Sequence, residues 1–265
     1  MSGRLAVRKT YKLYIGGAFP RSESGRTLEL EGYNVARASR KDAREAVVAA
    51  RKGFASWSTA TAYNRGQVLY RLAETMETRL GGLAAACSGR REVARAIDRV
   101  VWYAGWADKL AQVLGSSNPV AGPYFNFTFP EPTGVVAIVA PREPALDGLV
   151  ARTLPALTGG NAVVVVASEA HPLAAIELAE AVATSDVPAG VMNVLTGLRD
   201  ELAPILAAHM DVNAIDVTGA DGDVAALEAL AAENVKRVVR AREDRSPWEI
   251  AAFMELKTVW HPIGR

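Results

Sequence analysis

The sequence contains a single cysteine, Cys87, among 265 residues, which excludes an internal disulfide framework and any metal site built from several cysteines. It also lacks an excess of one charge, because 30 Lys and Arg stand against 29 Asp and Glu. Such a balanced chain is a poor electrostatic partner for nucleic acid, so we expect none. No apolar run reaches the roughly 18 residues of a membrane span, and no apolar stretch of a secretory leader follows Met1. We therefore expect a cytoplasmic protein without a membrane partner.

Histidine is almost as scarce as cysteine. His171, His209 and His261 lie far apart in the sequence and do not have the spacing of metal ligands. They are expected to pack or to face solvent, and no metal site is predicted. The sequence also has no Gly-x-Ser-x-Gly motif, so a hydrolase triad on this fold class has no support.

The remaining composition is that of an ordinary globular protein. Hydrophobic residues make up 50% of the chain and charged residues 22%. At about 150 residues per domain, the length indicates one large domain or two smaller ones. A chain of this size can bury a core that needs no disulfides to stabilise it.

The first half of the chain predicts a hairpin followed by helices. Aromatic and apolar residues alternate around Gly16-Gly17 in residues 11–35, which indicates short strands joined by turns. Ser39 followed by Asp42 forms a capping-box-like start for the first helix. Apolar residues recur every three to four positions in three helical stretches, at 43–57, at 63–80 with a stop at Gly81-Gly82, and at 90–114.

Strands and helices alternate in the second half. Predicted strands lie at 135–140, 162–167, 191–196, 212–218 and 236–241, and the helices between them at 146–157, 172–184, 200–208 and 223–233. Continuous runs of valine, as in AVVVVA at 162–167, take the place of polar alternation, which is typical of parallel strands covered on both faces. This pattern predicts an α/β fold with a doubly wound parallel sheet.

Two further strands stand outside this alternation. Residues 124–129 alternate with a period of two and place Phe125, Phe127 and Phe129 on one side, and Pro130-Glu131-Pro132 is expected to kink the chain before the next strand. Residues 256–261 have a β-type pattern at the far end of the chain. Both strands would leave bare edges or an uncovered aromatic face unless something pairs with them.

Several segments together resemble the aldehyde dehydrogenase family, in the family's order and spacing. They are the helical stretch DAREAVVAARKGFASWS, the strand PTGVVAIVAP, the segment LPALTGGNAVVVV, the turn and strand VPAGVMNVLTG, and the terminal LKTVWHPIG. The resemblance implies a Rossmann-type sheet with N-terminal helices and a β oligomerisation arm. It also implies three regions, namely an N-terminal hairpin, helices and oligomerisation strand at 1–133, a cofactor-type domain at 134–241, and a linker with the C-terminal oligomerisation strand at 242–265.

The same resemblance implies that the catalytic machinery is missing. In the family, a catalytic domain inserted before the C-terminal strand supplies the cysteine nucleophile, and a glutamate base lies in a Glu-Leu-Gly-Gly motif at its start. That motif would fall around 240–244, where it is absent. Glu143 stands where the family's asparagine would stabilise an oxyanion, and a carboxylate there would repel one. Cys87 is either a thiol activated by nearby arginines or a small apolar side chain, and we expect the second. No catalytic residue is therefore predicted.

Cofactor binding is weakened in the same comparison. Val166 replaces the family's ribose-binding lysine, and Asp200 and Glu201 begin a helix where a pyrophosphate would bind. We expect that no cofactor is required, and weak binding of NAD(P) stays open. The residues matching the family's cofactor contacts are Glu169, Gly197, Thr218 and Gly219.

The leading hypothesis is thus a non-catalytic subunit (a pseudoenzyme) that assembles with a full-length aldehyde dehydrogenase or with itself as a homo-oligomer. Its role would be structural or regulatory. The alternative is an NAD(H)-binding oxidoreductase of the family that acts on aldehydes, since the family activity is NAD(P)-dependent aldehyde oxidation. A decaying gene product is a third hypothesis, which the intact helix and strand periodicities oppose.

Overall fold

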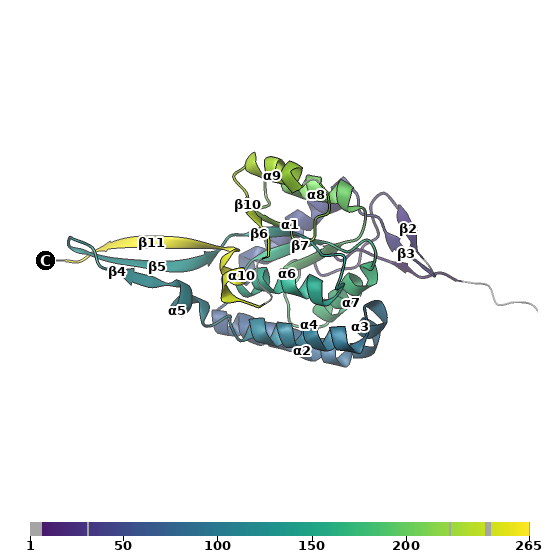
Figure 1. Ribbon diagram of the computed structural model, residues 1–265, viewed down its shortest axis with the longest axis horizontal. Coiled ribbons are helices and arrows are strands. Elements are labelled where there is room, and N and C mark those ends of the chain that lie inside the picture. The colour runs from purple at the N-terminus through teal and green to yellow at the C-terminus, as the bar shows by residue number, and fades with distance from the viewer. Residues whose placement is uncertain (1–6, 31, 223, 242–244, 265) are drawn as a thin grey trace, which may run out of the picture.

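The body of the molecule is built on a five-stranded parallel sheet (Figure 1). The structure, a computed structural model, describes residues 7–30, 32–222, 224–241 and 245–264. The strands lie in the order β10-β9-β6-β7-β8, and each pairs in parallel with its neighbour. Their bounds are β6 Val135–Val139, β7 Ala162–Val166, β8 Met192–Leu195, β9 Ala214–Asp216 and β10 Arg237–Val239. All five fall within the strands predicted from the sequence.

Helices cover both faces of this sheet, which confirms the doubly wound class. Because successive strand residues point to opposite faces, Val136 and Ile138 contribute to one hydrophobic cluster and Val135, Ala137 and Val139 to the other. The first cluster lies against α2 (Ala62–Thr78), α4 (Arg90–Ala104), α6 and α7, and the second against α1 (Arg40–Trp57), α8 and α9. The helices that follow the sheet strands are α6 Asp147–Thr158, α7 Pro172–Ala183, α8 Arg199–Ala208 and α9 Val224–Ala232.

The first helix begins where the sequence predicts. Ser39 caps α1 (Arg40–Trp57) with its hydroxyl oxygen, and the Asp42 carboxylate accepts from the Ser39 N–H at 2.7 Å, so the capping box is complete. Asp42 is buried and also accepts from the Ser22 hydroxyl at 2.7 Å, which fixes the turn that precedes the helix. This single carboxylate therefore ties the N-terminal loop to α1.

Two helix predictions need correction. The second stretch ends earlier than predicted, at Thr78, and Gly81-Gly82 lie inside a further short helix instead of stopping one. The stretch predicted at 90–114 is two helices, because α4 ends at Ala104, before Gly105, and tight turns occupy the residues up to Lys109. The bounds are α2 Ala62–Thr78, α3 Leu80–Ala86, α4 Arg90–Ala104 and α5 Leu110–Leu114.

The N-terminal hairpin lies later than predicted. β2 (Thr27–Leu30) pairs antiparallel with β3 (Tyr33–Ala36), while β1 (Thr10–Tyr11) pairs in parallel with β3. The Gly16-Gly17 segment forms only an isolated bridge, between Ile15 and Ala18. Both glycines have positive φ values, which explains the sharp turn.

Three strands form a separate antiparallel sheet, which we call the arm. β5 (Tyr124–Pro132) is flanked by β4 (Ser116–Asn118) and by β11 (Met254–Pro262), and β5 and β11 pair along nine residues each. Figure 1 shows the arm projecting from one end of the body. The bare edge expected for the C-terminal strand is thus covered on one side by β5.

The expected kink at Pro130 is wrong, since β5 continues to Pro132. Hydrogen bonds from Ile263 N–H to Pro123 O and from Thr133 N–H to Phe253 O show which residue pairs of β5 and β11 are hydrogen-bonded to each other. Antiparallel pairing alternates, so the backbone nitrogens of both prolines face away from β11. β4 pairs only with residues 126–128, and the prolines therefore lie at an open edge where no donor is required.

One short helix, α10 (Pro247–Ala251), connects the parallel sheet to the arm. Ile250 and Phe253 are fully buried against the body. Glu249 pairs with Arg152 of α6 at 2.9 Å, and Arg152 also pairs with Asp216 of β9 at 2.7 Å. The connection is therefore packed as part of the core. Among the described residues, no helix is both long enough and apolar enough to span a membrane.

Candidate functional site

The natural place for a ligand on this sheet is the crevice between β6 and β9. The strand order reverses there, and ligands of doubly wound folds bind outside the carboxyl ends of the strands at such a point. Ala140 follows β6 and Gly219 follows shortly after β9. The two backbones approach so closely that a Cβ on Gly219 would lie 2.3 Å from the carbonyl carbon of Ala140. Gly219 is therefore required for the two strand ends to pack.

The crevice is filled by a side chain of the protein itself. Arg199, the first residue of α8, is 6% exposed and donates to the Gly219 carbonyl at 2.9 Å and to the Ala140 carbonyl at 2.5 Å. It also pairs with Asp221 at 3.1 Å. Burial lowers the pKa of Arg199, and Asp221 opposes that shift by favouring the charged form. The guanidinium thus satisfies the carbonyls that face the switch point.

The N-terminus of α8 is also occupied. Glu169, in the loop after β7, accepts a hydrogen bond from the Arg199 backbone N–H through its carboxylate. Asp200 and Glu201 add two acids in the first turn of the same helix. A helix N-terminus favours anions because its N–H groups and its dipole point outward. Here the chain supplies the anion from its own side chains.

A cavity of about 250 Å³ opens beside Arg199, between α8 and α9. Its apolar wall comes from both helices and from the end of β6, and its polar groups are three carboxylates and two arginines. Asp221 pairs with Arg142 at 2.6 Å across its rim, and this pairing holds the pKa of Asp221 below its ordinary value. The lining residues are Val139, Arg142, Glu169, Arg199, Asp200, Ala203, Pro204, Ala220, Asp221, Ala226, Leu227 and Leu230.

The structure brings only part of the predicted cofactor set to this cavity. Glu169 lines it, and Gly197, Thr218 and Gly219 lie outside the lining among the described residues. Gly197 adopts φ 153° and packs the loop before α8 against Ala38, whose nitrogen would lie 3.2 Å from an added Cβ. The Thr218 hydroxyl accepts from the Ala241 N–H at 2.8 Å. These three residues therefore serve packing and backbone pairing.

The residues present do not fit a dinucleotide. A pyrophosphate at the start of α8 would meet the carboxylates of Glu169 and Asp200 and would have to displace the buried Arg199 guanidinium from two carbonyls. Sequence reasoning identified the acids but missed Arg199. The position of Arg199 in the sequence could have indicated its role. A cation in the first turn of a helix is disfavoured by the helix dipole, so it needs a specific hydrogen-bond or ion-pair partner.

Neither Cys87 nor Glu143 has the surroundings that aldehyde chemistry requires. Cys87 ends α3 and packs against the core of the helical face, and burial raises the pKa of its thiol to about 11. The prediction of a small packing residue is thus supported, and an activated thiol is not. Glu143 pairs with His171 at 2.9 Å on the surface. Ala241 is described, whereas residues 242–244 of the expected motif lie outside the described residues.

Comparison with known proteins shows the family to which the chain belongs. The model of the aldehyde dehydrogenase family matches residues 28–260. The chain belongs to the aldehyde dehydrogenase family. Aldehyde dehydrogenase 1A1 of Homo sapiens is 32% identical over 267 residues, which cover 92% of this chain and 52% of that protein.

Solved structures of the family have the same fold. HpcC from Thermus thermophilus matches with a TM-score of 0.81 and 30% identity, over 86% of this chain and 47% of that one. An NAD-dependent aldehyde dehydrogenase from Sinorhizobium meliloti matches with a TM-score of 0.78 and 27% identity, over 86% and 49%. This aldehyde dehydrogenase family member therefore spans about half the length of the relatives it matches. Among the described residues, α10 is the one helix between β10 and β11.

Proposed function

We propose that the chain is a non-catalytic subunit derived from an aldehyde dehydrogenase, which assembles with a full-length aldehyde dehydrogenase or with further copies of itself. Its role is structural or regulatory. The observation that carries this proposal is the arm, an antiparallel sheet that projects from the body (Figure 1) and carries exposed aromatic side chains. In this proposal, residues 1–133 and 242–265 supply the assembly elements around a cofactor-type domain at 134–241.

The arm has more apolar surface than it can bury by itself. Tyr124 is 43% exposed, Phe125 is 49% exposed and Trp260 is 59% exposed. The three phenylalanines of β5 stack along one face, with ring centroids 5.3 Å and 6.1 Å apart. A three-stranded sheet has two faces and needs a partner layer on at least one of them. Large exposed apolar patches of this kind mark interaction sites, and aromatic residues are enriched at them.

The candidate site supports the non-catalytic part of the proposal. The crevice holds Arg199, the start of α8 holds Glu169, and burial raises the pKa of the Cys87 thiol to about 11. Stabilising an oxyanion at the position of Glu143 would need a hydrogen-bond donor. The carboxylate of Glu143 is a hydrogen-bond acceptor and cannot supply that stabilisation. We place the assembly in the cytoplasm, in line with relatives named as cytosolic aldehyde dehydrogenases.

Co-expression tests the proposal. The tagged chain is expressed with the full-length aldehyde dehydrogenase of its own genome, and the captured material is examined for the untagged partner. We expect the partner to co-purify in a fixed ratio, and we expect the chain alone to show no aldehyde-dependent NADH formation. A well-behaved monomer that ignores the partner would contradict the assembly role.

The alternative function is an NAD(H)-binding oxidoreductase, and one observation favours it. Glu169, which matches a family cofactor contact, lines the cavity between α8 and α9. Calorimetric titration with NAD and with NADH separates the two functions. A dissociation constant in the micromolar range would favour the alternative, and one in the millimolar range or no heat would favour the non-catalytic subunit.

A further inference from the structure

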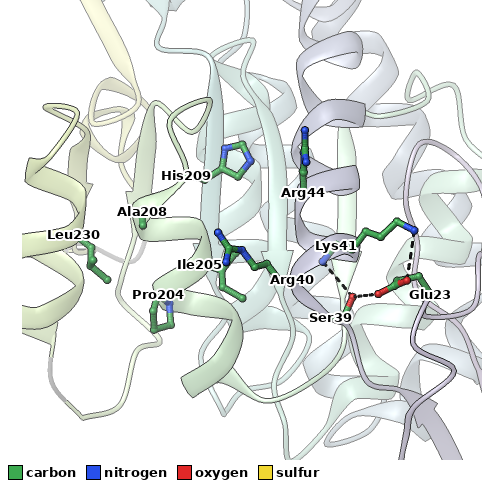
Figure 2. A pocket seen from close by; sticks show the side chains of 10 residues that line it. All are labelled: Glu23, Ser39, Arg40, Lys41, Arg44, Pro204, Ile205, Ala208, His209 and Leu230. Carbon is green, nitrogen blue, oxygen red and sulfur yellow. Dashed lines mark hydrogen bonds and ion pairs between the residues drawn. The ribbon is translucent and has the colours of Figure 1, made fainter.

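A groove on the body is not used by the candidate site. It has a volume of about 940 Å³ and runs between the start of α1 and the outer surfaces of α8 and α9. Figure 2 shows its two walls, with the α1 side chains on one and the α8 and α9 side chains on the other. The lining residues are Glu23, Ser39, Arg40, Lys41, Arg44, Pro204, Ile205, Ala208, His209 and Leu230.

One wall of the groove is cationic. Arg40, Lys41 and Arg44 are exposed, and Lys41 makes a weak pair with Glu23 at 3.5 Å. Within the described part of the chain, Arg40 and Arg44 form no ion pair. These two residues are four apart on α1, so their Cβ atoms lie about 5–6 Å from each other on one helix face. Two guanidinium groups one turn apart thus face the groove without an acidic partner.

The opposite wall is apolar. Pro204, Ile205 and Ala208 lie on or beside the exposed side of α8, and Leu230 comes from α9. His209, at the end of α8, adds little charge, because burial, Lys236 and Arg44 lower its pKa and only Asp211 opposes them. The imidazole is therefore neutral at pH 7. A ligand that covers both walls needs an acidic side and an apolar side.

We propose that this groove docks an acidic amphipathic helix of a partner protein. A helix laid in the groove would place carboxylates at positions i and i+4 opposite Arg40 and Arg44, and its apolar face against Ile205 and Leu230. Nucleic acid fits less well, since its phosphates would meet an apolar wall, Glu23 and a chain of net charge +1. The groove lies on the body and not on the arm, so it is a second and independent contact surface.

A designed peptide tests the proposal directly. The probe is a helical peptide with glutamates at i and i+4 on one face and leucines on the adjacent face, and its binding to the full chain is followed by fluorescence anisotropy. We expect micromolar binding that weakens as salt is raised. The double substitution Arg40→Glu and Arg44→Glu should weaken it at least about tenfold, and so should a peptide with glutamine in place of glutamate.

Matched variants identify the groove as the site. Arg90→Glu with Arg91→Glu makes the same charge change at the start of α4, on the other face of the sheet, and should leave binding unchanged. Ile205→Ser alters the apolar wall without changing charge and should weaken binding severalfold. Acidic residues suit the first turns of a helix, so both charge variants are expected to fold, which circular dichroism verifies.

Three results would overturn the proposal. The first is the absence of peptide binding at millimolar concentration, and the second is an equal loss of binding in the α4 control. The third is binding of single-stranded DNA or anionic vesicles through Arg40 and Arg44 without binding of the peptide. Disruption of the arm should leave peptide binding intact, so failure here is distinguishable from failure of arm-mediated assembly.

Discussion

At the scale of single residues, buried arginines join segments that are distant in the sequence. Arg152 of α6 lies between Asp216 of β9 and Glu249 of α10, and all three side chains are buried. Asp216 also accepts from the Thr218 N–H at 2.8 Å. Buried charges are tolerated only when they are paired and hydrogen-bonded. This network therefore fixes α10, the connection between sheet and arm, to the centre of the body.

Replacing this arginine should destabilise the whole body. Arg152→Met removes the cation that Asp216 and Glu249 share and leaves the fully buried Asp216 carboxylate facing an apolar side chain, so the free energy of unfolding should fall by about 3–5 kcal/mol. Urea unfolding measures the loss. The control Arg71→Met removes an exposed arginine that pairs with Glu74, and its effect should stay within about 0.5 kcal/mol. Equal losses in the free energy of unfolding for the two substitutions would show that the buried network stabilises the body no more than an exposed ion pair does.

The thiol of Cys87 should react slowly. Burial raises its pKa to about 11 from 9.0, so the reactive thiolate is scarce at neutral pH. Alkylation by iodoacetamide should be about a hundredfold slower at pH 8 than for an unperturbed thiol, and should accelerate up to pH 11. Because the unfolded chain loses this proton first, the corresponding contribution to stability is complete below pH 9 and is lost between pH 9 and pH 11. Rapid alkylation at pH 7 would contradict the assignment of Cys87 as a packing residue.

At the scale of elements, periodicity predicts most of this fold. Short apolar runs predicted the five parallel strands, and the capping box and helical spacing predicted α1 and the helices between the strands, because these patterns are local. The break in α4 at Gly105 was missed, since apolar spacing continues through the tight turns to Leu110. The continuation of β5 through Pro130 is possible because the proline nitrogen faces the open edge of the arm. Which edge it faces is set by pairing with β11, over 120 residues away, and no local pattern shows it.

The candidate site was harder to predict for the same reason. The family resemblance predicted Glu169 as a cofactor contact. Its actual hydrogen-bond donor, the Arg199 N–H, lies 30 residues further along the chain at the start of α8. The role of Arg199 depends on the meeting of Ala140 and Gly219, which no local pattern encodes. Long-range backbone approaches of this kind come from the topology of the sheet.

The arm should depend on the pairing between β11 and β5. Odd-numbered residues of β11 direct their N–H groups toward β5, so Val259→Pro removes a ladder hydrogen bond opposite Phe127. We expect this variant to weaken assembly at least about tenfold while the far-ultraviolet circular dichroism of the body is retained. Thr258→Pro is the matched control, because its nitrogen faces the open edge and the loss should be smaller. Assembly that is indifferent to Val259→Pro would mean that the arm is not the contact.

At the scale of the whole molecule, the chain combines a body, whose sheet crevice is filled, with an arm, whose apolar side chains are exposed. The crevice that would receive a cofactor is filled by Arg199, and the connection through α10 is packed into the core. The arm leaves large apolar side chains exposed, among them Tyr124, Phe125 and Trp260. This exposed apolar surface supports the proposal that the chain binds other subunits.

The most direct test of this account is the molar mass in solution, measured by light scattering on the chain alone and mixed with the full-length aldehyde dehydrogenase of the same genome. We predict a particle that contains several subunits, either a multiple of 28.2 kDa or a mixed complex in which both chains elute together. A particle of 28.2 kDa that stays separate from the full-length enzyme over the micromolar range would contradict the central claim.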